Sequence, residues 1–334
     1  MTGIGSRRRL VVVIGDALID EVRSPAGTQR YPGGAGFNLA IGVATRGAPT
    51  ALLTQMGADR DGDKLRAHLR ACKVGLLEQP QSASTPVMMS DRSGGEPSYF
   101  ASEAMLQRRI DVTPAVHAAL TSAAVVAANS VALQDDEQAS ALTRAFAGAS
   151  GLRVVDPNPR PALITDPRRF RTNFDLLMAY ADLVKVSAED LEFLYGGADQ
   201  SIVTRLLRGG ARAVVLTRGA AGAEIHTAHG GVVIVPTAAV PGPVLDTMGA
   251  GDATLASLIV TMLGELGLGP WPRNLLSAAV DALDWRPHLQ RAMVAAAATC
   301  RHRGAVVLPP DGAPPDISPT IGPVPRWPPR SVGR

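Results

Sequence analysis

The most informative stretch of the chain is Asp246-Thr247-Met248-Gly249-Ala250-Gly251-Asp252, which leads into the apolar run Ala253 to Val260. Gly249 and Gly251 flank a small alanine, so the backbone can turn tightly and approach a ligand with no Cβ in the way. The apolar run predicts a buried helix that begins at this turn, where free N–H groups and the positive end of the helix dipole converge. A transferring phosphate fits such a point, and Asp252 beside it is a candidate base for the attacking hydroxyl.

Asp252 also has a simpler interpretation as a helix cap, because Asp is favoured at helix N-termini. The surrounding residues favour the first interpretation, since the stretch closely resembles the Asp-Thr-x-Gly-Ala-Gly-Asp signature of the ribokinase-like (PfkB) family of carbohydrate and nucleoside kinases. The resemblance implies that Gly249, Ala250 and Gly251 form an anion hole and that Asp252 is the catalytic base. Met248 stands where the family usually has Thr, but its side chain is not part of the turn.

Length and composition allow one large α/β domain or two smaller ones, because 46% of the 334 residues are hydrophobic, enough for a sizeable core. Lys and Arg number 33 against 30 Asp and Glu, so no charge excess indicates a nucleic-acid partner. The lysines are Lys64, Lys73 and Lys185, and none follows Gly in a Gly-Lys-Ser/Thr unit. A phosphate-binding loop of the Walker type is therefore excluded.

The two cysteines, Cys72 and Cys300, are far apart, and a zinc site needs more ligands than either has at close spacing. We expect both to be buried thiols in a reducing compartment. The basic residues 7–9 precede an apolar run, but Asp16 and Asp20 break it too early for a signal peptide. Because no apolar segment reaches the length of a membrane span, we expect a soluble, cytoplasmic protein that binds neither membrane nor nucleic acid.

Two carboxylates follow the first predicted strand, the β-branched run from Leu10 to Ile14. Asp16 and Asp20 stand in Gly15-Asp16-Ala17-Leu18-Ile19-Asp20, at a strand end where α/β folds bind ligands. For Asp16 alone, a solvated turn is the favoured explanation. The segment is similar to the opening of fructokinase-like family members, which implies that Asp20, or else Asp16, binds sugar hydroxyls.

Glycines and an amide follow in Tyr31-Pro32-Gly33-Gly34-Ala35-Gly36-Phe37-Asn38. This is not a dinucleotide fingerprint, because Leu39 stands at the third Gly position. It resembles the family's Gly-Gly-x-x-x-Asn element, which implies that Gly33 and Gly34 let a sugar approach the backbone and that Asn38 binds its hydroxyls. A helix-cap role for Asn38 is equally compatible with the sequence.

A hairpin interrupts the alternation of helices and strands, because residues 85–91 alternate as a strand and residues 97–101 return. Together with residues 17–32, this hairpin would form the small β-sheet lid that covers the sugar in the family. Phe100 is a candidate substrate contact, although packing within the lid is its simpler role. The Gly-x-Asp-x-x-Gly segment at 57–62 matches another family signature, and we interpret it mainly as structural.

Two polar segments follow strands predicted at 153–156 and 182–186. The first resembles the family's Asp-x-Asn-x-Arg segment near the phosphate and sugar path. The second segment, Ser187 to Asp190, stands where the family has Asn-x-x-Glu, whose acid supports Mg²⁺ through water. This chain has Ser187 in place of Asn and the shorter acid Asp190 in place of Glu. The resulting candidates for substrate binding are Asn158 and Arg160, and those for nucleotide binding are Lys185 and Ser187. Asp190 is the candidate for metal binding, with Glu189 as the alternative.

The turn from Thr217 to Ala223 looks like the family's Thr-x-Gly-x-x-Gly-Ala nucleotide-binding turn, which singles out Thr217, Gly219 and Gly222. Val240 precedes the Gly249–Gly251 turn, called the phosphate turn below, and the resemblance implies that an apolar side chain at such a position lines the adenine. An alanine-rich helix over about 289–303 should pack beside the site. The proline-rich tail 309–334 should be extended or disordered, which leaves residues 10–308 as the kinase domain.

These segments predict a doubly wound, mostly parallel sheet flanked by helices, with a small β-sheet lid. The resemblance implies an ATP-dependent sugar kinase, with Mg²⁺ and a monovalent cation such as K⁺ as candidate cofactors. We predict fructose as the first substrate, 2-keto-3-deoxygluconate as the second and a nucleoside as the third, and a homodimer through the lid. The alternatives are a catalytically silent, sugar-binding regulator on the same fold and a nucleotide-dependent dehydrogenase, which the missing fingerprint weakens.

Overall fold

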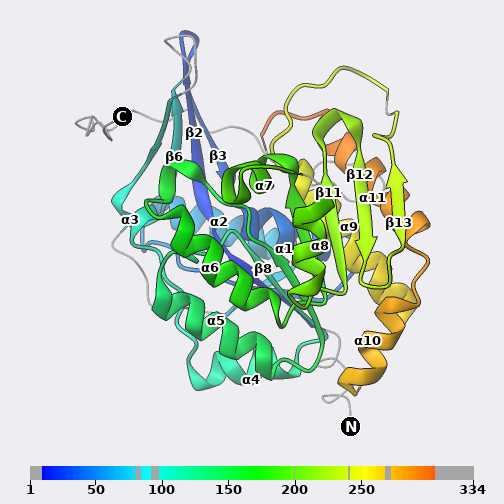
Figure 1. Cartoon of the computed structure of the whole chain (residues 1–334). Coiled ribbons are helices and arrows are strands. Elements are labelled where there is room, and N and C mark those ends of the chain that lie inside the picture. Colours follow the sequence, from blue (N-terminus) through cyan, green and yellow to red (C-terminus); the bar gives the residue numbers. More distant parts are fainter. Residues whose placement is uncertain are drawn as a thin grey trace.

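The computed structural model describes residues 10–77, 79, 84–91, 98–198, 200–239, 241–267 and 272–304. Val240 and the tail predicted at 309–334 therefore lie outside the described residues. Within those ranges the chain forms a large sheet between two layers of helices, and a smaller second sheet projects from this body (Figure 1).

The main sheet has nine strands in the described part of the chain. The pairings from β5 to β11 are parallel, and the last two strands add an antiparallel edge. Across the sheet the order is β13 (Val232–Val235), β12 (Ala223–Thr227), β11 (Ala213–Thr217), β10 (Leu183–Ser187), β9 (Leu152–Asp156), β8 (Val125–Asn129), β1 (Val11–Gly15), β4 (Thr50–Leu53) and β5 (Val74–Leu77).

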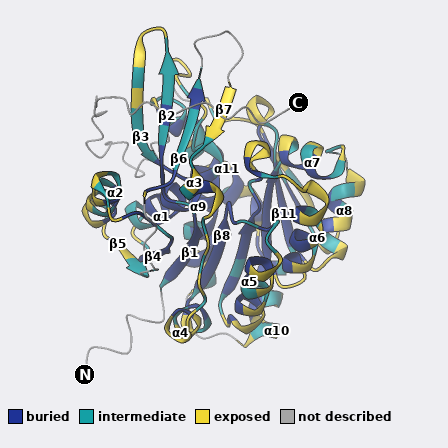
Figure 2. Cartoon of the chain, turned by 90° about the vertical axis from the view of Figure 1, so that its left-hand side faces the viewer, coloured by how far each residue is buried: buried dark blue, intermediate teal, exposed yellow. Residues whose placement is uncertain are grey.

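The strand β1 shows why helices cover both faces of this sheet. Val11 and Val13 belong to one hydrophobic core. Val12 and Ile14 belong to the other, and all four residues are 0% exposed. The strand β1 is accordingly dark blue in Figure 2. A strand buried on both faces needs a continuous apolar run rather than an alternating one. The predicted doubly wound, mostly parallel fold is therefore confirmed.

The helices divide between these two cores. One layer contains α1 (Ala35–Thr45), α2 (Arg60–Ala71), α9 (Ala250–Leu266), α10 (Arg273–Asp281) and α11 (Trp285–Thr299). The other contains α4 (Pro114–Ser122), α5 (Asp136–Gly148), α6 (Pro167–Met178), α7 (Ala188–Tyr195) and α8 (Gln200–Arg208). The short helices are α3 (Glu103–Leu106), η2 (Pro161–Leu163) and η3 (Gly219–Ala221).

The last helix, α11, begins at Trp285 rather than at the predicted position near 289. The Asp284 side chain caps it there by accepting a hydrogen bond from the Arg286 N–H. None of the described helices is long and apolar enough to cross a membrane.

The second sheet is formed by the segments predicted at 17–32 and 85–101, except for residues 92–97, which lie outside the described ranges. It projects from the body of the molecule in Figure 1, and its last strand is exposed in Figure 2. The order of its strands is β3 (Gly27–Gly33), β2 (Leu18–Ser24), β6 (Val87–Asp91) and β7 (Ser98–Ala101).

Asp59 joins the second sheet to the body of the molecule. Its carboxylate caps α2 by accepting a hydrogen bond from the Gly62 N–H at 2.8 Å. It also accepts hydrogen bonds from the Thr85 N–H at 2.7 Å and the Thr85 hydroxyl at 2.5 Å, just before β6 begins. A Cβ at Gly57 would overlap the backbone of Ser84 and Thr85, so this close approach requires glycine. The structure thus gives the 57–62 segment a structural role.

Candidate active site

Polar side chains line the edge of the main sheet where its parallel strands end. In open α/β sheets this edge is where ligands bind. The start of α9 reaches the same edge, because Asp252 of α9 contacts Asn129 of β8. The polar residues at or just after the strand ends are Asp16 at β1, Asn129 at β8, Asp156 at β9, Ser187 at β10 and Thr217 at β11.

Gly249 sets the turn at the start of α9. It occupies the cap position with a φ of 79°, a left-handed conformation that favours glycine. Asp252 is therefore the third residue of the helix and not its cap, so the helix-cap interpretation of Asp252 is wrong. No side chain of the described residues caps α9, which leaves this helix end open to an anion.

Two amides hold the Asp252 carboxylate. Asn38 of α1 donates to Oδ2 at 3.0 Å, and Asn129 donates to Oδ1 at 2.9 Å. Burial raises the pKa of Asp252, against the two amides and the charges of Lys185 and Arg160. A raised pKa makes a carboxylate a stronger general base near neutral pH. Asn38 is not a helix cap either, because α1 is capped by Gly34 and Asn38 lies within its first turn.

Lys185 brings a positive charge to the phosphate turn. Its Nζ lies 2.9 Å from Asp156 Oδ2 in a fully buried pair, and a Cβ added to Gly251 would lie only 2.9 Å from the same Nζ. Burial disfavours the ammonium, but Asp156 and Asp190 outweigh burial and raise the pKa of Lys185. Burial raises the pKa of Asp156 to about 6, so both groups are charged at neutral pH.

Asp20 and the paired glycines lie together at the base of the second sheet. The Asp20 carboxylate occupies the space that a side chain at Gly33 would need. Gly34 has a φ of 104°, and a Cβ there would overlap the backbone of Asp16. Burial raises the pKa of Asp20 to about 6; Arg160 opposes this rise, whereas Asp252 and Asp246 add to it.

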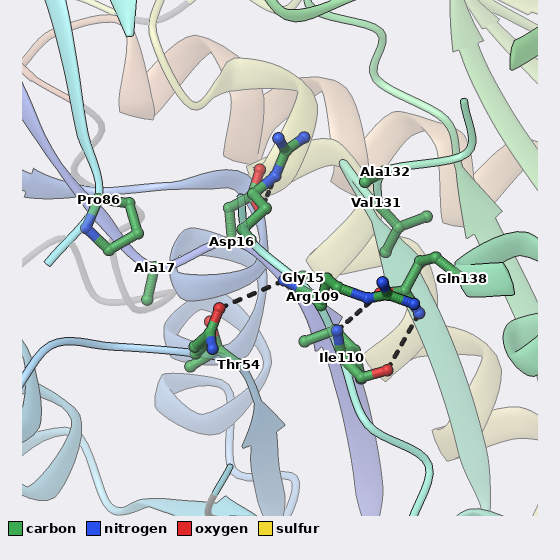
Figure 3. Close-up of a pocket in the computed structure, with 12 residues that line it drawn as sticks. Gly15, Asp16, Ala17, Thr54, Pro86, Arg109, Ile110, Val131, Ala132 and Gln138 are labelled. Atoms are coloured by element: carbon green, nitrogen blue, oxygen red, sulfur yellow. Dashed lines mark hydrogen bonds and ion pairs between the residues drawn. The ribbon is translucent and has the colours of Figure 1, made fainter. Parts of the chain in front are cut away.

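Asp16 is held in a separate network. The Arg108 Nε donates to Asp16 Oδ1 at 2.7 Å, and the Ser130 hydroxyl donates to Oδ2 at 3.1 Å. Burial raises the pKa of Asp16, against the Arg108 guanidinium and the Ser130 hydroxyl. The carboxylate lies beside a small cavity, shown in Figure 3, which Thr54, Pro86, Ile110 and Gln138 also line. Asp16 is thus neither in a solvated turn nor free to bind a ligand without competition from Arg108.

The structure places Asn158 and Arg160 near the polar residues around Asp252, but it does not place Phe100 there. The Asn158 amide donates to Asn129 Oδ1 at 3.2 Å. The positive charge of the exposed Arg160 opposes the rise in pKa of the Asp16, Asp20 and Asp252 carboxyls, so Arg160 lies in the same charged region as these groups. Phe100 pairs with Met89, which pairs with Glu21, and so it lies on the opposite face of the second sheet from Asp20.

Two of the candidate nucleotide and metal residues stabilise the start of a helix. Ser187 and Asp190 form a capping box at the start of α7, in which the Asp190 side chain accepts a hydrogen bond from the Ser187 N–H at 2.7 Å. Glu189 beside them is exposed. No group of three His, Cys, Asp or Glu side chains within the described ranges could hold a metal ion.

The turn after β11 places its two glycines differently. Gly219 has a φ of 53°, and a Cβ there would meet no atom within 4 Å, so this glycine faces open space. A Cβ at Gly222 would overlap the Val235 carbonyl, so Gly222 serves the packing of β12 against β13. Thr217 ends β11, and its hydroxyl lies 3.4 Å from the Val186 carbonyl oxygen.

Sequence reasoning missed three residues of this site: Asn129, Arg108 and Ser130. Asn129 ends the buried strand β8 and Ser130 follows it, in the way that Asp16 follows β1. The same signal, a polar residue at the carboxyl end of a predicted parallel strand, could have identified them. Arg108 follows α3 and gives no comparable signal.

Comparison with known proteins gives the family. The profile described as pfkB family carbohydrate kinase matches residues 8–311. The chain belongs to this family. A fructokinase from Klebsiella pneumoniae is 32% identical to this pfkB chain over 287 residues, which cover 80% of the chain and 88% of that fructokinase. The predicted family and enzyme class, a phosphotransferase acting on a sugar hydroxyl, are therefore confirmed.

Solved structures share the fold of this pfkB kinase. A fructokinase from Xylella fastidiosa with bound ATP has a TM-score of 0.76 at 23% identity, covering 89% of this chain and 94% of that one. A fructokinase from Vibrio cholerae, in a form with fructose, ADP and calcium ion bound, has a TM-score of 0.70 at 23% identity, covering 90% and 95%. The predicted ribokinase-like fold is confirmed.

Proposed function

We propose that this pfkB kinase transfers the γ-phosphoryl group of ATP to a primary hydroxyl of a fructose-like sugar. The observation that carries the proposal is the position of Asp252, a buried carboxylate in the first turn of α9, whose open N-terminus adjoins the Lys185 ammonium. A base beside an anion-binding turn can take the proton of a hydroxyl as the phosphoryl group reaches it. The Klebsiella fructokinase supports fructose as the first sugar to test.

The sugar would lie between the second sheet and the edge of the main sheet. Asp20 accepts no hydrogen bond from the described residues, and Asn38 Oδ1 is buried without a partner among them. Both can therefore accept hydrogen bonds from sugar hydroxyls, while Gly33 and Gly34 keep the backbone accessible. The second sheet then acts as the lid. Phe100 is not part of this site, because it lies on the other face of that sheet.

The nucleotide would lie along Thr217, Gly219 and the turn at Gly249, with Lys185 directed at the transferring phosphate. The few acids here suit Mg²⁺, which usually keeps several waters and binds through one or two carboxylates and the nucleotide phosphates. Asp190 is the first candidate to support the ion and the exposed Glu189 the second. When bound, Mg²⁺ would neutralise charge on the phosphates.

A coupled assay of ADP release tests the proposed substrate. The purified chain receives Mg·ATP with fructose, 2-keto-3-deoxygluconate or a nucleoside, and each reaction is repeated with K⁺ or Na⁺ as the only monovalent cation. We expect fructose to give the highest kcat/KM. A nucleoside or sugar acid that is faster would replace fructose, and ATP binding without ADP release for any acceptor would favour the silent regulator.

The first mutational prediction concerns the base. Asp252→Asn should keep ATP binding but lower kcat by the ~10²–10⁴ typical of general-base loss. The control is Asp175→Asn, since Asp175 also accepts hydrogen bonds from two side chains, Tyr195 and Arg205, but lies on α6. Activity of Asp252→Asn within a few-fold of wild type would remove Asp252 from the chemistry.

Assembly and location remain predictions. Two aromatic side chains on the surface of β7 support the pairing of two chains through the second sheet. They are Tyr99, which is 57% exposed, and Phe100, which is 38% exposed. The molar mass from light scattering tests it, because a monomer at assay concentration would contradict the pairing. We also propose a cytoplasmic location.

A further inference from the structure

We infer that Asn129 is a positioning residue for the reaction: its amide holds Oδ1 of Asp252, so that the other oxygen, Oδ2, receives the proton of the acceptor hydroxyl. The inference rests on the proposed function, because it assigns the two oxygens of the proposed base to different tasks. It concerns a residue at the end of β8 whose side chain would not itself touch the sugar or ATP.

All the hydrogen-bonding groups of the Asn129 side chain are used. Its Nδ2 donates both to Asp252 Oδ1 at 2.9 Å and to the Ala35 carbonyl at 3.2 Å. Its Oδ1 accepts from the Asn158 amide at 3.2 Å. The side chain is 0% exposed, so water cannot replace these bonds. Because two donors and one acceptor are all engaged, the amide has one orientation, and Asp252 Oδ1 has a fixed partner.

Asn38, on the other oxygen, is less constrained. Its Nδ2 donates to Asp252 Oδ2 at 3.0 Å, but its Oδ1 is buried without a hydrogen-bond partner among the described residues. A buried amide oxygen without a partner is costly and is relieved when a ligand donates to it. A sugar hydroxyl that binds Asn38 would therefore lie beside Oδ2, whereas Oδ1 remains occupied by Asn129. This asymmetry assigns the proton to Oδ2.

The charges around Asp252 come from several elements. Lys185 of β10 and Arg160 after β9 favour its ionised form, while Asp20 of β2 and Asp156 of β9 oppose it. Against these partly cancelling charges, the amides supply the direct hydrogen bonds to the carboxylate. Donation to an ionised carboxylate stabilises that form. Removing Asn129 should therefore raise the pKa of Asp252 and also free the orientation of the carboxylate.

Asn129→Leu tests the inference, because leucine has a similar size but no donor. We expect the acid limb of the pH dependence of kcat to move to higher pH by about one to two units, the shift expected for one lost hydrogen bond to a charged group. The rate should recover as the pH is raised, and the KM values for sugar and ATP should change less than kcat. If Asn129→Leu does not fold, Asn129→Ala repeats the test without overfilling the site.

The matched control is Asn173→Leu. Asn173 is also buried, and its Nδ2 also joins a backbone carbonyl, that of Leu133, to a carboxylate, that of Asp136, both at 2.8 Å. It lies on α6, away from the base, so this variant should lose stability without moving the acid limb. An equal shift in both variants would mean a general structural effect and would overturn the inference.

A second measurement does not depend on turnover. The ¹³C carboxyl signal of Asp252, assigned by its loss in Asp252→Asn, is titrated in the full-length protein without substrate. We expect its midpoint to rise in Asn129→Leu and not in Asn173→Leu. An unchanged midpoint together with an unchanged acid limb would overturn the inference. Because this titration needs no sugar, a wild-type protein inactive on every acceptor would refute the proposed function and still leave the role of Asn129 measurable.

Discussion

Asp20 and Asp252 are both carboxylates at the active site, but the protein supplies hydrogen bonds to only one of them. Asp252 accepts from two amides, whereas no donor among the described residues reaches Asp20. A carboxylate held by the protein keeps its geometry and suits chemistry. A carboxylate without a protein donor has its accepting positions free for the hydroxyls of a ligand. This difference supports the proposal that Asp252 acts in catalysis and that Asp20 binds the sugar.

Asp20→Ala should therefore raise the KM for sugar much more than the KM for ATP. The loss of hydrogen bonds to sugar hydroxyls corresponds to ~1–3 kcal/mol, which would raise the KM for sugar roughly 5- to 150-fold. Asp63→Ala, a change at an exposed carboxylate of α2, is the control. Equal effects on both KM values would show that Asp20 does not bind the sugar.

The pH dependence of sugar binding follows from the same group. Burial, with Asp252 and Asp246 adding to it and Arg160 opposing it, raises the pKa of Asp20 to about 6. Above that pH Asp20 is ionised and accepts hydrogen bonds, and below it the acid loses accepting capacity. The sugar KM of wild type should thus rise as the pH falls through about 6. Asp20→Ala should lack this rise; if it keeps the rise, another group is responsible.

At the scale of elements, the sequence predicted polar residues at most of the strand ends but not which strand ends meet. Asp16 and Asn38 were identified because they follow recognisable patterns. The strand-end signal could have identified Asn129 as a candidate, but its contact with Asp252 depends on β8 lying between β1 and β9 and on α9 returning to that edge. The spacing of Ser187 and Asp190 is that of a capping box, a local signal that could have been recognised. The face occupied by Phe100 required the register of β6 and β7.

The connection between α2 and the second sheet gives a prediction for the Asp59 carboxylate. Asp59→Ala should lower the free energy of unfolding by ~1–2 kcal/mol through the lost cap and should also raise the sugar KM, because Thr85 is no longer fixed. Asp166→Ala is the control, since Asp166 caps α6 through the Arg169 N–H without touching the second sheet. Urea denaturation and steady-state kinetics measure the two effects, and an unchanged sugar KM in Asp59→Ala would contradict the connection.

Low pH should weaken the connection that the Asp59 carboxylate makes between α2 and the second sheet. Burial alone would raise the pKa of Asp59, but the hydrogen bonds from Thr85 and Gly62 outweigh it and hold the pKa below its usual value. A carboxyl whose folded pKa is lowered stabilises the fold above its unfolded pKa, and this contribution is lost as the pH falls below about 4.

In the whole molecule, the second sheet is attached to the body at several points. Arg30 of β3 forms ion pairs with Glu21 of β2, at 3.1 Å, and with Asp61 of α2, at 2.9 Å. Tyr31 of β3 packs against Gly304, whose N–H donates to Asp246 beside the phosphate turn at 3.0 Å. Arg30 and Tyr31 thus attach β3 to the body, and the hydrogen bonds of Asp59 to Thr85 attach the start of β6, whereas β7 is largely exposed.

Sugar that bridges Asp20 and Asn38 should therefore slow amide hydrogen exchange in β6 and β7. Under the proposed function, saturating fructose would add a contact between the two sheets to the attachments that the chain already makes at β3 and at the start of β6. The strand β10, buried in the main sheet, is the internal control and should be unaffected. Equal exchange of β6 and β7 with and without fructose would show that the second sheet is not ordered by substrate.

The bonds that hold Asp252 join positions very far apart along the chain. Asn38 precedes Asp252 by 214 positions and Asn129 precedes it by 123. Neither bond can form before α9 has been synthesised and has closed the long loops between them. A nascent chain on the ribosome can thus assemble the first strands and the Asp20 carboxylate before Asp252, the proposed base, has been synthesised. If Asp252 is the base, as proposed, phosphoryl transfer would have to wait until α9 has been synthesised and has packed at this edge of the sheet.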